Sequence, residues 1–119
     1  MFGLSRRERA LKKATGVLAE FYQVPHPGPR ASLADLPMLA VDVETTGLSP
    51  RDDRLLSIGW VPIDGGTITL AGAGHVVLQQ RDGTSVGESA TIHGLTDDAV
   101  RAGMPAAEAV TGLLRALQG

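Results

Sequence analysis

The stretch that decides the fold runs Met38-Leu39-Ala40-Val41-Asp42-Val43-Glu44-Thr45-Thr46-Gly47-Leu48. Its apolar first half leads directly into two carboxylates, Asp42 and Glu44, a pattern typical of a buried central strand with a polar end. Residues two apart on a strand point to the same face, about 6.5–7 Å apart along the strand axis. We therefore expect Asp42 and Glu44 side by side on one face, and Val41 and Val43 turned into the core.

Two neighbouring carboxylates repel each other, and burial adds to the cost of keeping both ionised. Divalent cations remove this cost, and oxygen ligands suit Mg²⁺ or Mn²⁺. Two such ions about 3.5–4 Å apart serve phosphodiester hydrolysis, one by activating water and the other by stabilising the leaving oxygen. The spacing of Asp42 and Glu44 alone fits a metal site and equally fits two solvated acids at a strand end.

The residues before this strand predict a helical extension and a linker. Ser5 and Glu8 have the spacing of a capping box, and an apolar stripe at helical intervals continues to Phe21 beside a basic face. Residues 1–24 are expected to form an amphipathic basic helix. Residues 25–35 are rich in proline and are expected to form a linker, because proline fits neither helix nor sheet interiors.

Residues 36–119 predict an α/β domain, a mixed sheet with helices on it. A second strand is expected at 55–63, a hairpin turn at 64–66, and a return strand that Gly72 and Gly74 interrupt with a bulge. Helices follow near residues 96–103 and at 105–118. Natural sheets usually have about 4–6 strands. Three strands therefore predict a domain that is incomplete at its C-terminal end.

Composition excludes several classes of function. The chain has no cysteine, which excludes disulfides, thiolate zinc sites and cysteine nucleophiles. Only four aromatic residues are present, too few for a module that stacks nucleic-acid bases. No apolar run approaches the about 20 residues of a membrane span, so no membrane partner is expected. With neither a leader nor a cysteine, we expect a cytoplasmic protein.

Charge is distributed unevenly along the chain. Residues 1–30 contain six basic and two acidic residues, whereas residues 31–119 contain five basic and eleven acidic residues. An acidic globular part repels a polyanion unless metal ions or local donors compensate. Charge alone therefore gives no indication of nucleic-acid binding.

Three segments carry a resemblance to a known family. Residues 42–48, Asp-Val-Glu-Thr-Thr-Gly-Leu, resemble the first motif of the DEDD-type 3′–5′ exonucleases, in particular the proofreading epsilon subunit of bacterial DNA polymerase III. Residues 92–96, Ile-His-Gly-Leu-Thr, resemble a second signature of that family. Residues 56–60 look like its second strand. The resemblance covers residues 36–119, the N-terminal portion of the family's domain.

The resemblance implies a ribonuclease H-like fold and 3′–5′ hydrolysis of nucleic acid, usually single-stranded DNA, with two Mg²⁺ or Mn²⁺ ions. Asp42 and Glu44 would be the catalytic metal ligands. The resemblance also implies a substrate-binding set, in which the terminal nucleotide is held by Thr45, Thr46, Gly47, Leu48 and His93. Two structural interpretations stay open: residues 45–47 can form an ordinary turn, and His93 can be a structural histidine at a strand-to-helix junction.

The sequence also departs from the family pattern. The family requires two more aspartates and a general-base histidine, carried by elements beyond the helix at 105–118. His93 and Asp98 have the spacing of the family's catalytic histidine–aspartate pair, but the Ile-His-Gly signature is distinct from that pair. Asp97 and Asp98 are explained as charges that favour a helix N-terminus. We therefore expect this chain alone to have little or no nuclease activity.

Two other functions remain as alternatives. The chain could be a non-catalytic binding module derived from the exonuclease fold, with the helix at 5–22 contacting a protein partner. In that case Asp42 and Glu44 are a relic or a weak cation site. A different magnesium phosphohydrolase using the same strand pair is the third reading, although the sequence has no phosphate-binding loop.

Overall fold

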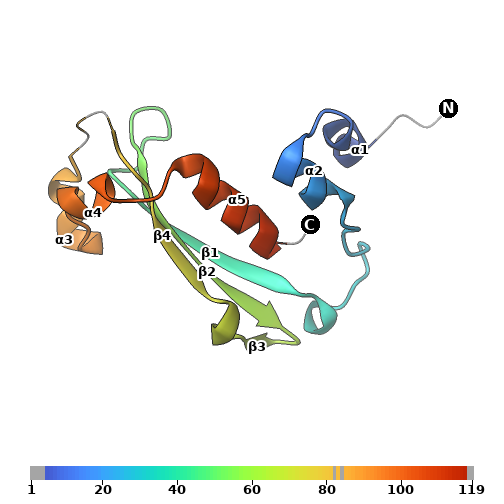
Figure 1. Cartoon of the computed structure of the whole chain (residues 1–119). Coiled ribbons are helices and arrows are strands. Elements are labelled where there is room, and N and C mark those ends of the chain that lie inside the picture. The colour runs from blue at the N-terminus through green and yellow to red at the C-terminus, as the bar shows by residue number, and fades with distance from the viewer. Residues whose placement is uncertain (1–4, 82, 84, 118–119) are drawn as a thin grey trace.

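The computed structural model describes residues 5–81, 83 and 85–117. The helices are α1 (Arg6–Leu11), α2 (Gly16–Gln23), α3 (Ala90–His93), α4 (Asp97–Arg101) and α5 (Ala106–Leu117). The strands are β1 (Met38–Thr45), β2 (Leu55–Asp64), β3 (Thr67–Ile68) and β4 (Gly74–Val77). Short 3₁₀ turns lie at Leu33–Asp35, Leu70–Gly72 and Gly87–Ser89. Figure 1 shows the sheet with α5 across it and with α1 and α2 beyond α5.

The α/β fold expected from the sequence is confirmed, with β2 at the centre of the sheet. β1 runs antiparallel along one edge of β2, from Met38 opposite Ile63 to Glu44 opposite Ser57. β3 and β4 both pair with the other edge of β2, also antiparallel. The expected return strand is thus two strands, because the turn at Leu70–Gly72 separates them. The one parallel pairing in the described chain is an isolated bridge between Leu78 and Met104.

The hairpin between β2 and β3 forms where the sequence predicts it. Asp64 pairs with Thr67, so Gly65 and Gly66 are a two-residue loop. Their φ angles are +54° and +76°. Positive φ at both central positions is the geometry that matches the twist of a hairpin, and glycine adopts it without steric cost.

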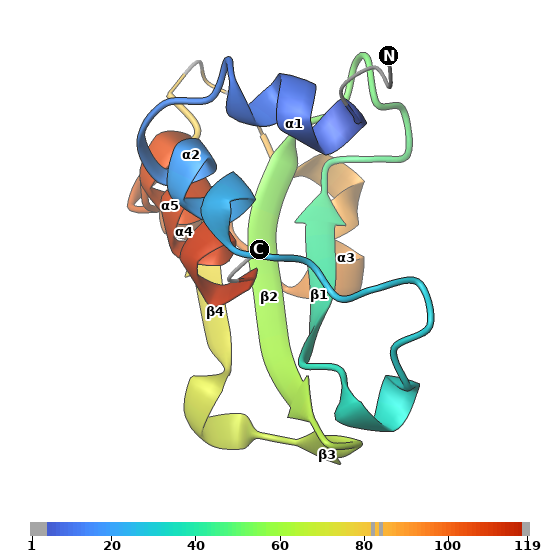
Figure 2. The same ribbon diagram turned by 90° about the vertical axis from the view of Figure 1, so that its right-hand side faces the viewer.

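β1 is an edge strand in the described part of the chain, and the prediction of a buried central strand is wrong. Val41 and Val43 lie opposite Trp60 and Ile58, on the face of the α5 cluster as expected, but they are 45% and 47% exposed and so are not buried in the core. The reason is where α5 lies: its Ala109 packs on Ile58 of β2 and on Leu78, which follows β4. Figure 2 shows α5 over this half of the sheet, with β1 left beside it.

The core of the described residues consists of two clusters, one that contains the bulge residue of β2 and one that packs under α5. Glu44 pairs with Ser57 and Thr45 pairs with Leu55, so Leu56 is an extra residue with no partner on β1. Such a bulge re-aims the side chain next to it. Leu56 accordingly packs with Val86 and Val100 near α3 and α4, while the α5 cluster contains Ile58, Leu78 and Ala109.

A single helix is expected at residues 1–24; residues 1–4 lie outside the described residues, and the remainder forms two helices. Its predicted capping box is confirmed, since Ser5 Oγ accepts from Glu8 N at 3.2 Å and Glu8 Oε2 accepts from Ser5 N at 2.6 Å. The helix breaks after Leu11 because Thr15 is extended and Gly16 has a φ of +57°. Among all the residues that the structure describes, no helix is long and apolar enough to cross a membrane.

Arg7 joins the two N-terminal helices. Its Nη2 donates to the carbonyls of Phe21, at 3.3 Å, and Val24, at 2.5 Å. The guanidinium also lies over the rings of Phe21 and Tyr22, at 5.7 and 5.4 Å from their centroids. α2 in turn packs on α5, where Glu20 pairs with Arg115 at 3.8 Å. α1 is therefore attached to the sheet through α2 and α5.

Candidate active site

Asp42 and Glu44 lie on the same face of the sheet, as the alternation of β1 predicts. Across the register Asp42 is opposite Gly59, and Glu44 is opposite Ser57. Residues directly opposite each other in an antiparallel pair share a face. The two carboxylates line one small hollow of about 70 Å³ together with Val43, Ser57, Gly59 and His75.

The surroundings of the two carboxylates hold no compensating cation. Asp42 is exposed and Glu44 is half-buried, and neither forms an ion pair with any residue described. Ser57, on the floor beside Glu44, is only 1% exposed. Two carboxylates at such a hollow present oxygen ligands with uncompensated negative charge, which suits a hard divalent cation.

The donor set fits one hard cation and falls short of a full two-ion cage. Mg²⁺ keeps several waters and is usually held by one or two carboxylates together with substrate phosphates. Asp42 and Glu44 meet that requirement. Within residues 5–81, 83 and 85–117 no three His, Cys, Asp or Glu side chains gather as a metal site. A second ion therefore needs further oxygen ligands, from substrate or from groups outside these residues.

His75 belongs to the same face, although the sequence pattern indicates no partner for it. On β4 it pairs with Gly59, which itself pairs with Asp42, so Asp42, Gly59 and His75 form one row across three strands. A Cβ on Gly59 would lie 3.7 Å from Cδ2 of His75. Glycine therefore leaves the space between the carboxylate and the imidazole open. The register of the Gly65–Gly66 hairpin would set Gly59 opposite Gly72, and the turn at Leu70–Gly72 shifts it by three residues, so no local signal in the sequence points to this histidine.

The turn after β1 is held by hydrogen bonds of its own threonines. Thr45 Oγ1 donates to the carbonyl of Gly47 at 2.5 Å. Thr46 N donates to the carbonyl of Arg54 at 3.0 Å, and Thr46 Oγ1 accepts from Arg54 N at 2.9 Å. Leu48, which follows, is 98% exposed. The turn thus presents a solvent-exposed leucine side chain at the end of the strand that carries the two carboxylates.

Asp53 is the residue that fixes this turn, and sequence reasoning did not single it out. Its carboxylate accepts from Ser49 N and from Thr46 Oγ1, each at 2.8 Å. These hydrogen bonds, the one from Ser49 first, hold the pKa of Asp53 below its ordinary value. A Cβ on Gly47 would lie 2.7 Å from Cγ of Asp53. The motif glycine is therefore required by the position of the Asp53 carboxylate.

Both ring nitrogens of His93 lie within hydrogen-bonding distance of a partner. Its Nδ1 accepts from the amide of Leu95 at 3.0 Å, and its Nε2 lies 2.9 Å from Ser89 Oγ. Gly94, at a φ of +71°, ends α3 next to it. These contacts hold the connection between α3 and α4, so His93 lies at a helix-to-helix junction and not at the expected strand-to-helix junction. Asp97 accepts from Val86 N at 2.9 Å, and Asp98 pairs with Arg101. Both aspartates therefore serve local structure.

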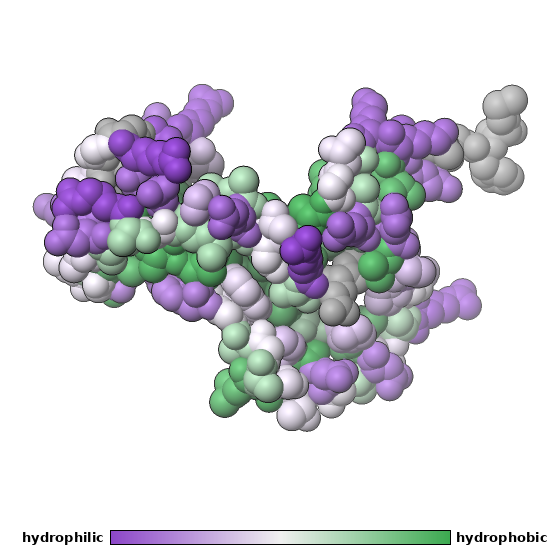
Figure 3. Space-filling model, viewed as in Figure 1, coloured by the Kyte–Doolittle hydropathy of each residue, from purple (hydrophilic) through white to green (hydrophobic). Residues whose placement is uncertain are grey.

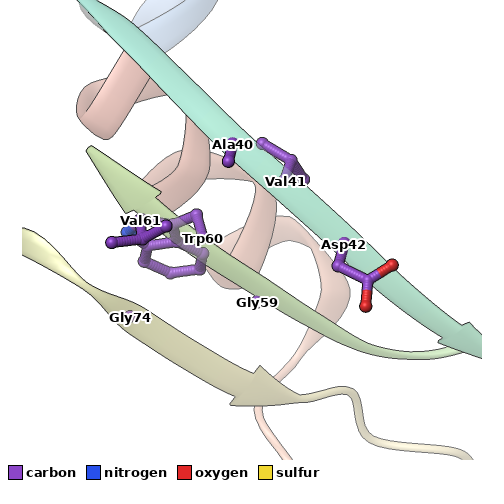
Figure 4. Close-up of a pocket in the computed structure, with 7 residues that line it drawn as sticks. All are labelled: Ala40, Val41, Asp42, Gly59, Trp60, Val61 and Gly74. Carbon is purple, nitrogen blue, oxygen red and sulfur yellow. The ribbon is translucent and has the colours of Figure 1, made fainter. Parts of the chain in front are cut away.

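An apolar pocket of about 360 Å³ continues from Asp42 along the sheet. Figure 4 shows Asp42 at one end of it and Trp60 and Val61 toward the other, above Gly74. The Trp60 ring lies against the Cα of Gly74, where a Cβ would be 2.8 Å from Nε1 of the indole. The pocket gives the Asp42 carboxylate an apolar neighbourhood on one side.

Comparison with known proteins identifies the family. The model of the RNase_T exonuclease family matches residues 39–119, which include both carboxylates, the turn after β1 and all four strands but for Met38. No curated protein matches the chain. The chain belongs to the RNase_T exonuclease family.

Proposed function

We propose that this chain is the N-terminal part of a 3′–5′ exonuclease active site, similar to the proofreading epsilon subunit of bacterial DNA polymerase III and cytoplasmic. The proposed substrate is single-stranded nucleic acid, DNA in preference to RNA. The observation that carries the proposal is the shared hollow of Asp42 and Glu44, in a chain of an exonuclease family. Membership of that family supports nucleic-acid hydrolysis as the general activity.

In this proposal Asp42 and Glu44 hold Mg²⁺ or Mn²⁺. When bound, the two ions supply an activated water and stabilise the leaving oxygen of the phosphodiester. The half-buried Glu44 has less freedom than the exposed Asp42, so it orients the site, while Asp42 can adjust to a substrate. Both roles depend on the strand, which fixes the two carboxylates on one face.

The turn at Thr45–Leu48 is proposed to hold the terminal nucleotide. The amides of Gly47 and Leu48 donate to no acceptor among the described residues, so both are available to a phosphate or sugar oxygen. Leu48 is fully accessible to lie against a base. Thr45 and Thr46 are proposed to keep the turn in this shape, and His93 to support the neighbouring α3–α4 connection.

The chain alone is proposed to be inactive or nearly so. Residues 39–119 supply two carboxylates at the site. Two described histidines come into question as a base: His75 at the site and His93 in the second signature. His93 is held by Leu95 and Ser89, and His75 lies across Gly59 from Asp42. General-base catalysis contributes about 10²–10⁴-fold, and the second metal adds further charge stabilisation.

Product binding tests the proposed function without requiring turnover. We expect thymidine 5′-monophosphate and Mg²⁺ together to shift the NMR signals of the Leu48 methyls and the Gly47 amide. Each ligand alone should have little effect, because nucleotide and metal share the site. The double variant Asp42→Asn/Glu44→Gln should abolish the shifts. The matched variant Asp64→Asn/Glu108→Gln, which removes two exposed carboxylates elsewhere, should keep them.

Two results would count against the proposal. Shifts confined to residues away from the turn and the hollow would place the nucleotide elsewhere. Robust digestion of a single-stranded oligonucleotide that disappears in Asp42→Ala would support catalysis by this site but contradict the proposed inactivity of the chain.

A non-catalytic binding module is the second candidate function. The observation that favours it is the two-carboxylate donor set, together with the exposed faces of Val41 and Val43. A folded, monodisperse chain that binds neither Mg²⁺ nor nucleotide would support this candidate. Metal-dependent nucleotide binding at Leu48 would exclude it.

A further inference from the structure

Positive charge is concentrated in one short segment of the chain. Five of its eleven Lys and Arg residues lie between residues 6 and 13, including both lysines. The exposed members of this group are Arg6, Arg9, Lys12 and Lys13. Steps of three and four residues place side chains on the same side of a helical turn. Arg6 and Arg9 lie on α1, and Lys12 and Lys13 lie in the turn directly after it; these four residues are called the basic α1 face below.

The described acids near the basic α1 face are fewer than its basic residues. The carboxylate of Glu8 caps α1 through Ser5, and Lys12 adds to the lowering of the pKa of Glu8. Glu20 points to α5 and pairs with Arg115. The segment from residue 5 to residue 13 therefore keeps a clear excess of positive charge.

Arg7 is excluded from this face because it is used inside the structure. It binds the carbonyls of Phe21 and Val24 and lies over two aromatic rings. Since α2 packs on α5, this contact gives α1 a fixed place on the domain. The basic α1 face is therefore presented on a defined surface, where Figure 3 shows hydrophilic side chains gathered over α1.

The basic α1 face lies on the same upper side of the molecule as the turn that follows β1, with α5 between the two in Figure 1. Figures 1 and 2 are related by a rotation about the vertical axis, and both show α1 and the β1–β2 turn at the top. The rest of the chain is acidic, with eleven acidic and five basic residues after position 30. A polyanion held at the acidic site therefore needs cations elsewhere on the surface.

We propose that the basic α1 face binds the phosphate backbone of the single-stranded nucleic acid whose end is held at Asp42 and Glu44. The inference rests on the proposed function for the choice of ligand. Arg and Lys side chains bind a backbone without reading its bases, so the contact is independent of sequence. It makes α1 the element that retains the strand while its end is at the site.

The experiment measures binding of a fluorescent single-stranded DNA of about 20 nucleotides by anisotropy, in EDTA so that no cleavage occurs, from about 50 to 200 mM salt. The test variant is Arg6→Gln/Lys12→Gln/Lys13→Gln. The matched control, Arg30→Gln/Arg81→Gln/Arg101→Gln, removes the same charge from exposed positions elsewhere. Circular dichroism checks that both variants keep the fold.

We expect the test variant to lose about tenfold in affinity and to reduce the slope of log affinity against log salt by about 2, since each single-strand contact contributes about 0.7. The control should keep affinity and slope close to those of the unmodified chain. Equal losses in both variants would overturn the inference, because net charge would then explain the binding. Absence of binding by the unmodified chain would also overturn it.

Two further arms separate this inference from the proposed function and from a protein partner. Asp42→Asn/Glu44→Gln should keep the binding of single-stranded DNA that depends on α1. The DNA-binding result therefore stays interpretable even if the hollow binds no nucleotide. Competition by poly-glutamate as effective as competition by unlabelled DNA would overturn the nucleic-acid assignment. Weak competition by poly-glutamate would support it.

Discussion

The carboxylate of Asp53 occupies the space beside Gly47 where any larger residue would place its Cβ, 2.7 Å from Cγ. The same carboxylate accepts hydrogen bonds from Ser49 N and Thr46 Oγ1. One acidic side chain thus joins both arms of the turn that follows the two site carboxylates. The turn has its shape because Gly47 leaves room for Asp53.

Gly47→Ala should destabilise the chain by about 1–3 kcal/mol, because its methyl group forces the Asp53 carboxylate away from Thr46 and Ser49. Urea unfolding measures this loss. In an Asp53→Ala background the clash is absent, so the same substitution should cost clearly less. Equal costs in the two backgrounds would show that the carboxylate is not what excludes a side chain at position 47.

The contribution of Asp53 to stability should depend on pH in one direction. Hydrogen bonds lower the pKa of Asp53 in the folded chain below the ordinary value of 3.8. A lowered pKa means that the stabilisation is fully present above 3.8 and is lost as the pH falls through the folded pKa. The amide proton of Ser49 should therefore titrate with a midpoint below 3.8.

The neighbouring Asp52 provides the control for this titration. It accepts from Ser49 Oγ at 2.8 Å but is exposed and makes no contact with Thr46. Asp52→Asn should leave the Ser49 amide transition in place, and Asp53→Asn should remove it. A transition that survives in Asp53→Asn would assign the titration to another group.

Because β1 is an edge strand in the described chain, truncating its valines should cost less stability than truncating a core valine. Val43→Ala should cost less than about 1 kcal/mol because Val43 is 47% exposed, whereas Val100→Ala should cost about 2 kcal/mol because Val100 is fully buried. Denaturant midpoints of the two variants measure the difference. Equal costs would mean that β1 is covered in solution.

Gly74→Ala should displace the indole of Trp60, because a Cβ at position 74 would lie 2.8 Å from Nε1. Trp60 is the only tryptophan, so its fluorescence reports the displacement directly. Gly28→Ala is the matched control, since no atom lies within 4 Å of a Cβ at that position. An unchanged emission spectrum in Gly74→Ala would contradict the described packing of the ring.

Local patterns predicted the elements that carry the site. The alternation around Asp42 and Glu44 is a property of one strand, so it placed both carboxylates on one face without knowledge of the rest. The glycine pair at 65–66 likewise specified its own turn. The capping box at Ser5 and Glu8 was also correct, because both partners lie within one helical turn.

The features that the sequence did not predict depend on contacts between distant segments. An apolar run such as residues 38–41 fits a central strand and an edge strand equally, and only the packing of α5 on β2 distinguishes them. His75 reaches the site through the register of three strands. In the sequence Asp53 resembles any acidic residue of a turn, and only the structure shows its carboxylate against Gly47.

The most direct test of the account is the binding of Mn²⁺ to the hollow between Asp42 and Glu44, measured by electron paramagnetic resonance. We expect saturable binding by the unmodified chain, retained in Asp64→Asn/Glu108→Gln and lost in Asp42→Asn/Glu44→Gln. Binding that persists when both site carboxylates are neutralised, or no binding by the unmodified chain, would contradict it.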